Sequence, residues 1–241
     1  MNNNAKTSTM ELTQSDVDAL RALDTPTVCN ALELVVPQRR GMGYTTRPLV
    51  CARPDLPPMV GYARTATIRA MHPSEESAAA LRQRRNAYYA HVAEAPGPTI
   101  AVIQDLDPQP GYGAFWGEVN TNIHKGLGCL GVVTDGSIRD LAACAEGFQL
   151  LAGSIGPSHA YVRVEQHGVT VTVAGMTVRP GDLLHADRHG AVVIPIEAAR
   201  EVPKAAALIA RREAVVIAAS RRTGFDHAAL MRAISEADEI R

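Results

Sequence analysis

The sequence predicts one α/β domain, an α/β sandwich of the swivelling type with helices at its C-terminal end. Segments with strand and helix periodicity alternate early in the chain, whereas strand-like segments cluster late, before two long helices. The 241 residues are 46% hydrophobic, which is enough to bury one sizeable core. We therefore expect residues 1–14 to form a flexible tail and residues 15–241 to form a single domain, with C-terminal helices from about residue 197.

The first half of the chain is expected to start with two short helices. Apolar residues recur at helical spacing within residues 15–34, and Asp24 followed by Pro26 is typical of a capped helix start. A loop rich in proline and arginine comes next, followed by an alternating strand, a helix opened by a serine, and a buried strand that ends at Asp105. These four segments are residues 37–60, 61–71, 74–93 and 98–103.

The second half is expected to contain short strands and then helices. Two of the strands should form a hairpin after a turn at residues 179–182, where proline, glycine and aspartate come together. A proline near the start of the first C-terminal helix is tolerated there. The expected strands and helices are residues 150–155, 169–173, 183–186, 191–195, 197–222 and 226–240.

The central segment, residues 117–140, carries the most chemistry. It contains a literal G-x-G-x-x-G at residues 126–131, but a helix precedes the glycines and a strand follows them. A dinucleotide site needs the reverse order, so these glycines are expected to end a helix and start a strand. Arg139 and Asp140 stand where that strand ends and the next helix begins, a position suited to holding an anionic substrate and a divalent cation. A surface ion pair or helix cap is the alternative interpretation.

Composition limits the partners and the compartment. A net charge of −1 and a pI near 6.7 provide no basic surface for nucleic acid or for an anionic membrane. The N-terminus is polar and no segment has the apolar length of a membrane span, so we expect a cytoplasmic protein. The cysteines show no metal-binding spacing and are expected to be reduced core residues. They are Cys29, Cys51, Cys129 and Cys144.

One group of histidines resembles a metal site. On an extended strand His185, Asp187 and His189 would face the same side, but the sequence around Gly190 is more typical of a hairpin turn in which the aspartate binds backbone amides. We therefore expect a turn. His159 is a weak candidate for lining a pocket.

Several segments, in order, match a known protein family. They are residues 24–32, 61–66, 117–140, 178–187, 190–195 and 212–213. With these residues the chain resembles the family that contains the class II 4-hydroxy-4-methyl-2-oxoglutarate aldolases and the regulator of ribonuclease activity A. The resemblance implies an RraA-like α/β/β sandwich of the swivelling-domain type. It is less specific for one activity, because the family includes lyases and a branch described as a protein regulator.

The resemblance also implies roles for particular residues. Asp140 would bind Mg²⁺ or Mn²⁺, and Arg139 would contact a 2-oxo acid. Gly117 would belong to the substrate-binding site, where the amides of Val119 and Asn120 would bind the substrate carboxylate. Two glutamates would hold the water shell of the metal, one within the chain and one from an adjacent subunit of a homotrimer or a dimer of trimers. They are Glu118 and Glu213.

The chain departs from the family pattern at two positions. Ala143 stands where an acid usually follows the aspartate, and Asn30 stands where an aspartate is usual. Loss of an acid from the outer shell is expected to loosen the metal or change the substrate.

The expected function is that of a divalent-metal-dependent lyase. It would cleave or decarboxylate small 2-oxo acids, such as 4-hydroxy-2-oxo acids or oxaloacetate, through a pyruvate enolate. A Schiff-base aldolase would instead need a desolvated lysine, for which Lys125 is a better candidate than Lys6 or Lys204. The alternative from another class is a non-catalytic regulator that binds a ribonuclease or a helicase.

Overall fold

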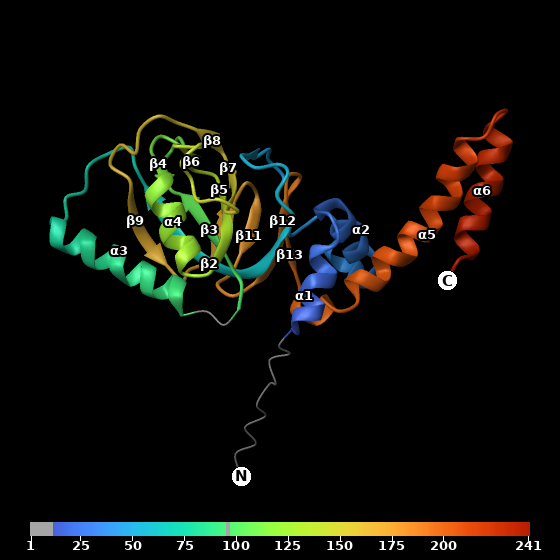
Figure 1. The fold of residues 1–241 in the computed structure, drawn as a ribbon, viewed down its shortest axis with the longest axis horizontal. Helices are drawn as coiled ribbons and strands as arrows, with labels where there is room; N and C mark the ends of the chain where they lie inside the picture. The colour runs from blue at the N-terminus through green and yellow to red at the C-terminus, as the bar shows by residue number, and fades with distance from the viewer. Residues whose placement is uncertain (1–11, 95–96) are drawn as a thin grey trace, which may run out of the picture.

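A mixed β-sheet forms the centre of the computed structural model, which describes residues 12–94 and 97–241 (Figure 1). Its strands are β1 (Val50–Cys51), β2 (Met59–Arg69), β3 (Thr99–Asp105), β5 (Cys129–Thr134), β7 (Gln149–Ala152), β9 (Arg163–His167), β12 (Leu183–Asp187) and β13 (Gly190–Ile194). The strand order is β1, β7, β5, β3, β2, β12, β13, and β9 pairs with β2 outside this order. Strands β2, β3, β5 and β7 run parallel, whereas β12 joins β2 antiparallel.

Helices and two small sheets surround this central sheet. The helices are α1 (Gln14–Arg21), α2 (Thr25–Val35), α3 (Ala78–Ala93), α4 (Glu118–Gly126), α5 (Val202–Ser220) and α6 (His227–Glu239), with short 3₁₀ turns η1 (Pro37–Arg39) and η2 (Ile196–Ala198). The small sheets are the hairpin of β10 (Val171–Val173) with β11 (Met176–Val178), and the three parallel strands β4 (Ala114–Trp116), β6 (Ser137–Ile138) and β8 (Ser154–Ile155).

The core is divided between the two faces of the sheet and its β13 end. On one face, Tyr88 of α3 is buried together with Trp116 and Phe148. On the other face, the β10–β11 hairpin packs Val173 and Met176 against the strands. A third cluster joins α1, α2 and α5 to β12 and β13. The layers of helix, sheet and hairpin confirm the predicted α/β sandwich with C-terminal helices.

The predicted elements differ from the observed ones mainly at their boundaries. Helix α3 starts after Ser77, whose hydroxyl accepts the N–H of Ala80, so the helix start expected at Ser74 was too early. The strand expected at residues 150–155 is divided into β7 and β8. Helix α5 begins at Val202, after η2, later than expected. Strand β9 was not predicted, because only Val164 of its five residues is buried and its other residues are polar.

The two predicted N-terminal helices are confirmed. Thr13 caps α1 and forms a capping box with Asp16, and Asp24 caps α2. Helix α1 starts at Gln14 with Thr13 as its N-cap, so these last two residues of the expected tail, residues 1–14, form the start of the helix. Its residues 1–11 lie outside the described part of the chain.

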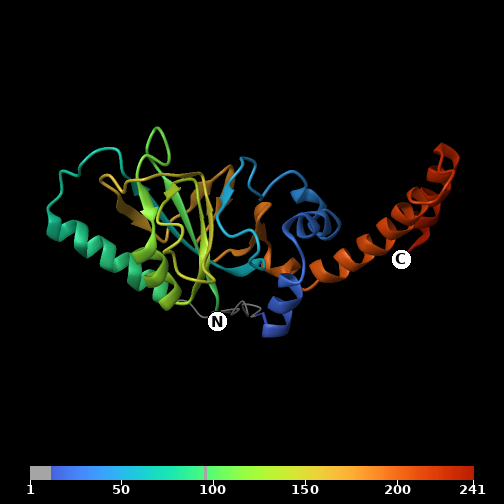
Figure 2. The ribbon, with the colours of Figure 1, turned by 45° about the horizontal axis from the view of Figure 1, so that its top comes forward.

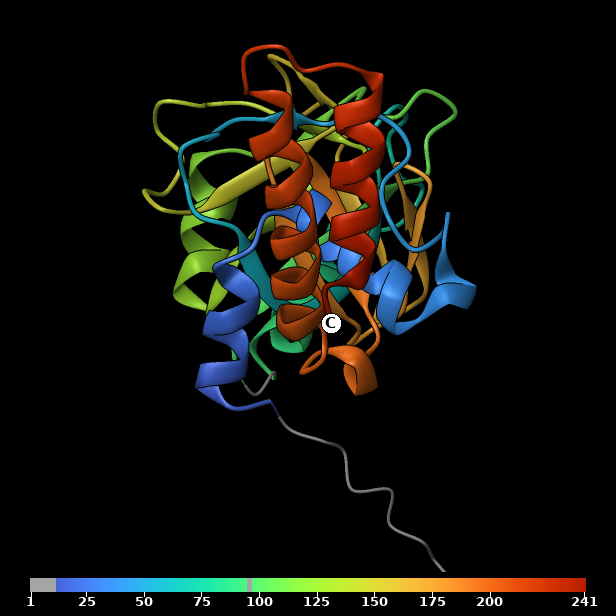
Figure 3. The same cartoon turned by 90° about the vertical axis from the view of Figure 1, so that its right-hand side faces the viewer.

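Helices α5 and α6 extend away from the sheet as a pair (Figures 1 and 2). In Figure 3 the two helices run side by side up the picture, in front of the sheet. Helix α5 packs on α2 near its start, whereas most contacts of α6 are with α5. Large apolar side chains on this pair remain exposed, among them Ile217 and Met231. Within the described residues, no helix is both long and apolar enough to cross a membrane.

One glycine is essential to the spacing of the central sheet. Gly131 lies opposite Gln149 in the pair β5–β7, and a Cβ at Gly131 would overlap the Gln149 carbonyl and lie 2.5 Å from the sulfur of Met59. We expect Gly131→Ala to lower the free energy of unfolding by about 1–3 kcal/mol, because the strands must separate. Chemical denaturation checks this. A denaturation midpoint equal to that of the parent protein would show that the strands accommodate the added methyl group without loss of stability.

Candidate active site

Arg139 and Asp140 follow β6, and Gly117 and Glu118 follow β4. Because β4 and β6 are parallel neighbours, their carboxyl ends lie at the same edge and bring these residues together. The Arg139 N–H donates to the Trp116 carbonyl at 2.9 Å, which joins the two strand ends. The structure thus places the two segments that the sequence singled out side by side, close to the start of α4 (Figure 1).

The helix expected directly after Asp140 does not form. Asp140 has a left-handed backbone with φ +53°, and its carbonyl accepts the N–H groups of Ala143 and Cys144 in a turn. Aspartate is one of the few residues besides glycine that tolerate this conformation. The turn directs the chain back into the core, where Cys144 is buried and its thiol donates to the Arg139 carbonyl at 3.4 Å. Burial raises the pKa of this thiol.

The Arg139–Asp140 pair is close but still accessible. The guanidinium Nε lies 3.6 Å from the Asp140 Oδ2, and the two side chains are 35% and 36% exposed. A pair this exposed adds little to stability. The carboxylate and the guanidinium therefore remain accessible to a ligand. An ion pair with a purely structural role would not need this exposure.

Gly117 makes room for the Asp140 carboxylate. A Cβ at Gly117 would lie 2.6 Å from Asp140 Oδ2 and 3.2 Å from Arg139 Cγ. The φ of Gly117 is −167°, an extended conformation that any residue adopts, so the need for glycine here is steric. The sequence predicted Gly117 as part of the site, but its role as a spacer is apparent only from the geometry.

The first turn of α4 presents free backbone donors. Gly117 is its N-cap and supplies no side-chain cap, and the first helical bond runs from Thr121 N–H to the Gly117 carbonyl. Within the described chain, the amides of Glu118, Val119 and Asn120 have no protein acceptor. Helix N-termini of this kind bind anions through their N–H groups and dipole. Both glutamate and valine side chains of this turn are exposed.

A buried hydrogen-bond network holds this helix start in place. The Asn120 side chain accepts from the Tyr89 hydroxyl at 2.8 Å and donates to the Phe115 carbonyl. His124 lies 2.7 Å from both the Asn120 carbonyl and the Tyr88 hydroxyl. Because a carbonyl only accepts, His124 Nδ1 carries the proton and Nε2 accepts from the tyrosine. Burial lowers the pKa of His124 to about 4, so the ring is neutral.

Glu213 is not near this site within one chain. It is exposed on α5, the helix that extends from the β13 end of the sheet, whereas α4 packs toward the other end (Figure 1). The other site residues of the prediction, which are Gly117, Glu118, Val119, Asn120, Arg139 and Asp140, gather around the α4 N-terminus. Glu213 could therefore contribute only from another copy of the chain.

The structure gives little support to a Schiff-base lysine. Lys125 is exposed, and its ammonium donates to the Glu146 carbonyl at the surface. Lys204 is also exposed and pairs with Glu201. Neither environment is the desolvated pocket that would lower a lysine pKa. Lys6 lies outside the described residues.

The histidine group near Gly190 is a hairpin turn, as predicted. Asp187 accepts the amides of Thr25 and His189, and His185 is buried between Thr25 and the Leu23 carbonyl. Burial lowers the pKa of His185. His159 is exposed and bonds within its own loop. In residues 12–94 and 97–241 there is no group of three or more histidine, cysteine or acidic side chains placed to hold a metal ion.

The remaining sequence predictions about this region also hold. The glycines of the G-x-G-x-x-G end α4 and begin β5, so no helix follows them to receive a pyrophosphate. The four cysteines are free thiols; two are buried and two are half-buried, namely Cys129, Cys144, Cys29 and Cys51. Asp105, at the end of β3, is buried and accepts the amides of Asp107 and Gly111, so it stabilises the loop that follows the strand.

The site residues fit one kind of metal ion. Mg²⁺ and Mn²⁺ prefer oxygen ligands, and Mg²⁺ keeps several waters and often takes one or two carboxylates together with oxygens of the substrate. The exposed Asp140 carboxylate, with room cleared by Gly117, supplies one such ligand. Glu118 on the adjacent turn could receive hydrogen bonds from bound water. A metal that prefers thiolate or imidazole ligands would find no comparable group of ligands among the described residues.

Comparisons with known proteins agree on the fold. A Pseudomonas syringae pv. tomato str. DC3000 protein described as uncharacterized matches with TM-score 0.69 and 22% identity, covering 98% of this chain and 100% of that one. Streptomyces coelicolor RraAS2, described as an unusual member of the RNase ES inhibitor RraA protein family, matches with TM-score 0.66 and 24% identity, covering 85% and 96%. These identities establish a shared fold only.

A further structure is described as a novel cellulase from microbes associated with the gut ecosystem. It has TM-score 0.70 and 17% identity and covers 87% of this chain and 90% of that one. A comparison with curated proteins gives no match. A family model described as RraA-like, Aldolase/RraA, matches residues 25–193, which include the strands of the central sheet and the whole Arg139–Asp140 site. The chain belongs to the RraA-like (Aldolase/RraA) family.

Proposed function

We propose that the protein is a divalent-metal-dependent carbon–carbon lyase for small 2-oxo acids, such as 4-hydroxy-2-oxo acids or oxaloacetate. The observation that supports it best is the convergence of three features at Gly117: an exposed Asp140 carboxylate, a partly exposed Arg139 guanidinium and the free amides of α4. A 2-oxo acid offers a carboxylate and a carbonyl oxygen side by side. Its charge distribution therefore matches this set of donors and the metal ligand.

Each residue has a stated task in this proposal. Asp140 holds Mg²⁺ or Mn²⁺, and the amides of Val119 and Asn120 bind the substrate carboxylate. When bound, the ion would polarise the 2-oxo group as a Lewis acid. Breaking the C3–C4 bond leaves its electron pair on C3 as a pyruvate enolate, and Arg139 donates hydrogen bonds to the developing negative oxygen. In aldol cleavage the C4 hydroxyl gives its proton to water and becomes the carbonyl of the released aldehyde or ketone, whereas in decarboxylation C4 leaves as CO₂. In both reactions C3 of the enolate then takes a proton from water, which gives pyruvate.

Arg139→Lys tests the planar guanidinium. Lysine keeps the positive charge but cannot supply two parallel N–H donors, so we expect kcat/KM for oxaloacetate to fall by about tenfold, the value of roughly one charge-assisted hydrogen bond. Steady-state kinetics with saturating Mg²⁺ measures the effect. Kinetics equal to those of the parent protein would show that Arg139 does not stabilise the enolate oxygen.

Assembly is the second part of the proposal. We propose a homotrimer or a dimer of trimers in which Glu213 of one subunit reaches the Asp140 site of another. The projecting α5–α6 pair, with its exposed apolar residues, supports this arrangement because such a pair is poorly covered in one chain. Glu213 would then accept hydrogen bonds from metal-bound water.

A complementation experiment checks the shared site. Asp140→Ala and Glu213→Ala are each expected to be weakly active, and Glu213→Ala should lose roughly 10–100-fold as an outer-shell change. After the two variants are dissociated, mixed and reassembled, some interfaces carry both native residues and activity should return. Mixed assemblies that stay as inactive as the separate variants would show that Glu213 does not act across subunits.

A non-catalytic regulator that binds a ribonuclease or helicase is the second candidate. It is favoured by Ala143, which is exposed beside Asp140 at a position where an acid is usual in the family. A methyl group there cannot bind the water shell of a metal. Saturable binding of such a partner, together with no turnover of any 2-oxo acid at any metal concentration, would favour the regulator.

A further inference from the structure

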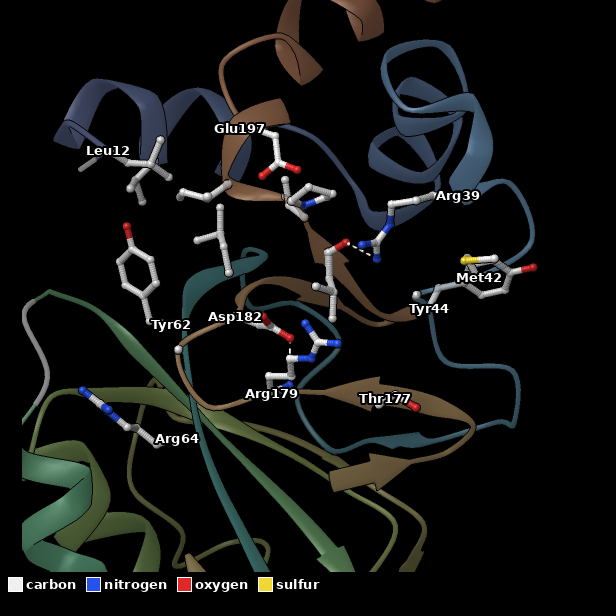
Figure 4. Close-up of a pocket in the computed structure, with 18 of the residues that line it drawn as sticks. Leu12, Arg39, Met42, Tyr44, Tyr62, Arg64, Thr177, Arg179, Asp182 and Glu197 are labelled. Atoms are coloured by element: carbon white, nitrogen blue, oxygen red, sulfur yellow. Dashed lines mark hydrogen bonds between the residues drawn. The ribbon is translucent and has the colours of Figure 1, made fainter. Parts of the chain in front are cut away.

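A large cleft lies between the N-terminal helices and the central sheet, away from Arg139 and Asp140. Its volume is about 1180 Å³, and its walls come from α1, the loop after η1, the turn between β11 and β12, and the segment after β13 (Figure 4). Pro98, just before β3, also lines it. The cleft therefore adjoins the amino end of β3, whereas the Arg139–Asp140 site lies beyond the carboxyl ends of β4 and β6.

Two arginines from opposite walls point into the same part of the cleft. Arg39 reaches in from the end of η1, and Arg179 reaches in from the β11–β12 turn (Figure 4). A Cβ at Gly43 would overlap the Arg39 guanidinium, so the glycine leaves the space that this group uses. Arg64 also lines the cleft, but its guanidinium points toward a different end.

These guanidinium groups are not neutralised by the carboxylates beside them. Arg39 donates one long bond, 3.4 Å, to the Val193 carbonyl, and the Arg179 guanidinium has no ion pair or hydrogen bond among the described residues. Asp182 instead accepts the backbone N–H of Arg179 at 2.8 Å. Glu197 is exposed at the upper rim of the cleft and also forms no ion pair with the arginines in the described chain. Several N–H groups of these two arginines therefore face the cleft without a hydrogen-bond acceptor among the described residues.

We propose that this cleft binds a small dianion that bridges Arg39 and Arg179. Each guanidinium presents a planar pair of N–H donors that fits a carboxylate or a phosphoryl group, and two forks on opposite walls fit a molecule with two such negative charges. A dicarboxylate and a phosphate share this chemistry. The site is separate from the proposed active site, so its ligand can bind without displacing a 2-oxo acid.

Calorimetric titration and thermal denaturation with two probes, succinate and inorganic phosphate, test the site. The parent for these experiments carries Arg139→Ala, so that anion binding beside Asp140 is weakened. We expect at least one probe to bind at millimolar concentration or better. Arg39→Ala and Arg179→Ala should each weaken that binding by about tenfold or more, because each removes a charge-assisted bond. Binding of succinate alone would identify a dicarboxylate site, and binding of phosphate alone a phosphoryl site.

The matched control is Arg40→Ala. Arg40 is adjacent in sequence and equally charged, but it pairs with Glu33 at 3.0 Å and its side chain is 76% exposed. Binding should survive this change. Arg39→Lys and Arg179→Lys keep the positive charge but lack the planar pair of N–H donors. They provide folded variants if an alanine is not tolerated, and they should also weaken binding. The proposal is overturned if neither probe binds the parent, or if Arg40→Ala weakens binding as much as Arg179→Ala.

Discussion

Asp140→Ala is expected to lower metal-dependent turnover by more than about 100-fold, because changes to outer-shell residues alone cost 10–100-fold and Asp140 is the proposed direct ligand. The fold should be little affected. The carboxylate is 36% exposed and its ion pair with Arg139 is a surface one. Asp140→Ala also places an alanine in a left-handed conformation, so Asp140→Asn, which tolerates that backbone, is the better variant for separating chemistry from strain.

The measurement is turnover of oxaloacetate across a Mg²⁺ and Mn²⁺ titration, with thermal denaturation in parallel. Both variants should be folded and should lose more than about 100-fold of this turnover, and Asp140→Asn should melt close to the parent protein. Full activity in Asp140→Asn would show that the Asp140 carboxylate does not bind the metal. Unfolding of Asp140→Ala with a folded but inactive asparagine variant would still be consistent with the proposed role.

Gly117→Ala should have the next largest effect, a loss of at least about tenfold in kcat/KM. The new Cβ would lie 2.6 Å from Asp140 Oδ2, which is closer than a nonbonded carbon and oxygen can approach, so the carboxylate must move. A misplacement of about 1 Å at a reacting centre is enough to cost up to 100-fold. Because Gly117 has an extended backbone, alanine adds no conformational strain to this steric effect.

Gly126→Ala provides the control for this change. Gly126 is the last residue of the same helix, and a Cβ there meets no other atom within 4 Å. Alanine should leave kinetics unchanged and stabilise α4 by up to about 1 kcal/mol. Steady-state kinetics and metal affinity are measured for both variants. A Gly117→Ala protein that binds Mg²⁺ and substrate like Gly126→Ala would show that the packing of Gly117 against Asp140 has no functional consequence.

The sequence predicted most of the fold because, in most elements, the buried apolar residues recur with the period of a helix or of a strand. The hairpin of β12 and β13 and the capped helices α1 and α2 have such patterns together with clear turn and cap residues. Strand β9 has no such pattern, since it is an edge partner of β2 with one buried residue. Helix boundaries near serines also remained ambiguous, because both Ser74 and Ser77 can cap a helix and the structure uses the second.

The candidate site was predicted by its residues but not by its geometry. Arg139 and Asp140 were predicted as site residues because they form a charged pair after a strand. The family resemblance predicted the residues at the start of α4. Their contact depends on the parallel pairing of β4 and β6, strands of three and two residues that are too short to show a periodicity. The left-handed turn at Asp140 was missed for a similar reason, because residues after it resemble a first helical turn.

The most direct test of the proposed function is an assay of the metal-free protein with oxaloacetate and with a 4-hydroxy-2-oxo acid, before and after Mg²⁺ is added. We expect no turnover without metal, turnover of at least one substrate with Mg²⁺, and loss of that turnover on chelation. Release of pyruvate should accompany it, as required by cleavage between C3 and C4. Turnover that is unchanged by chelation, or no turnover of either substrate with Mg²⁺ or Mn²⁺, would contradict a metal-dependent lyase at Asp140.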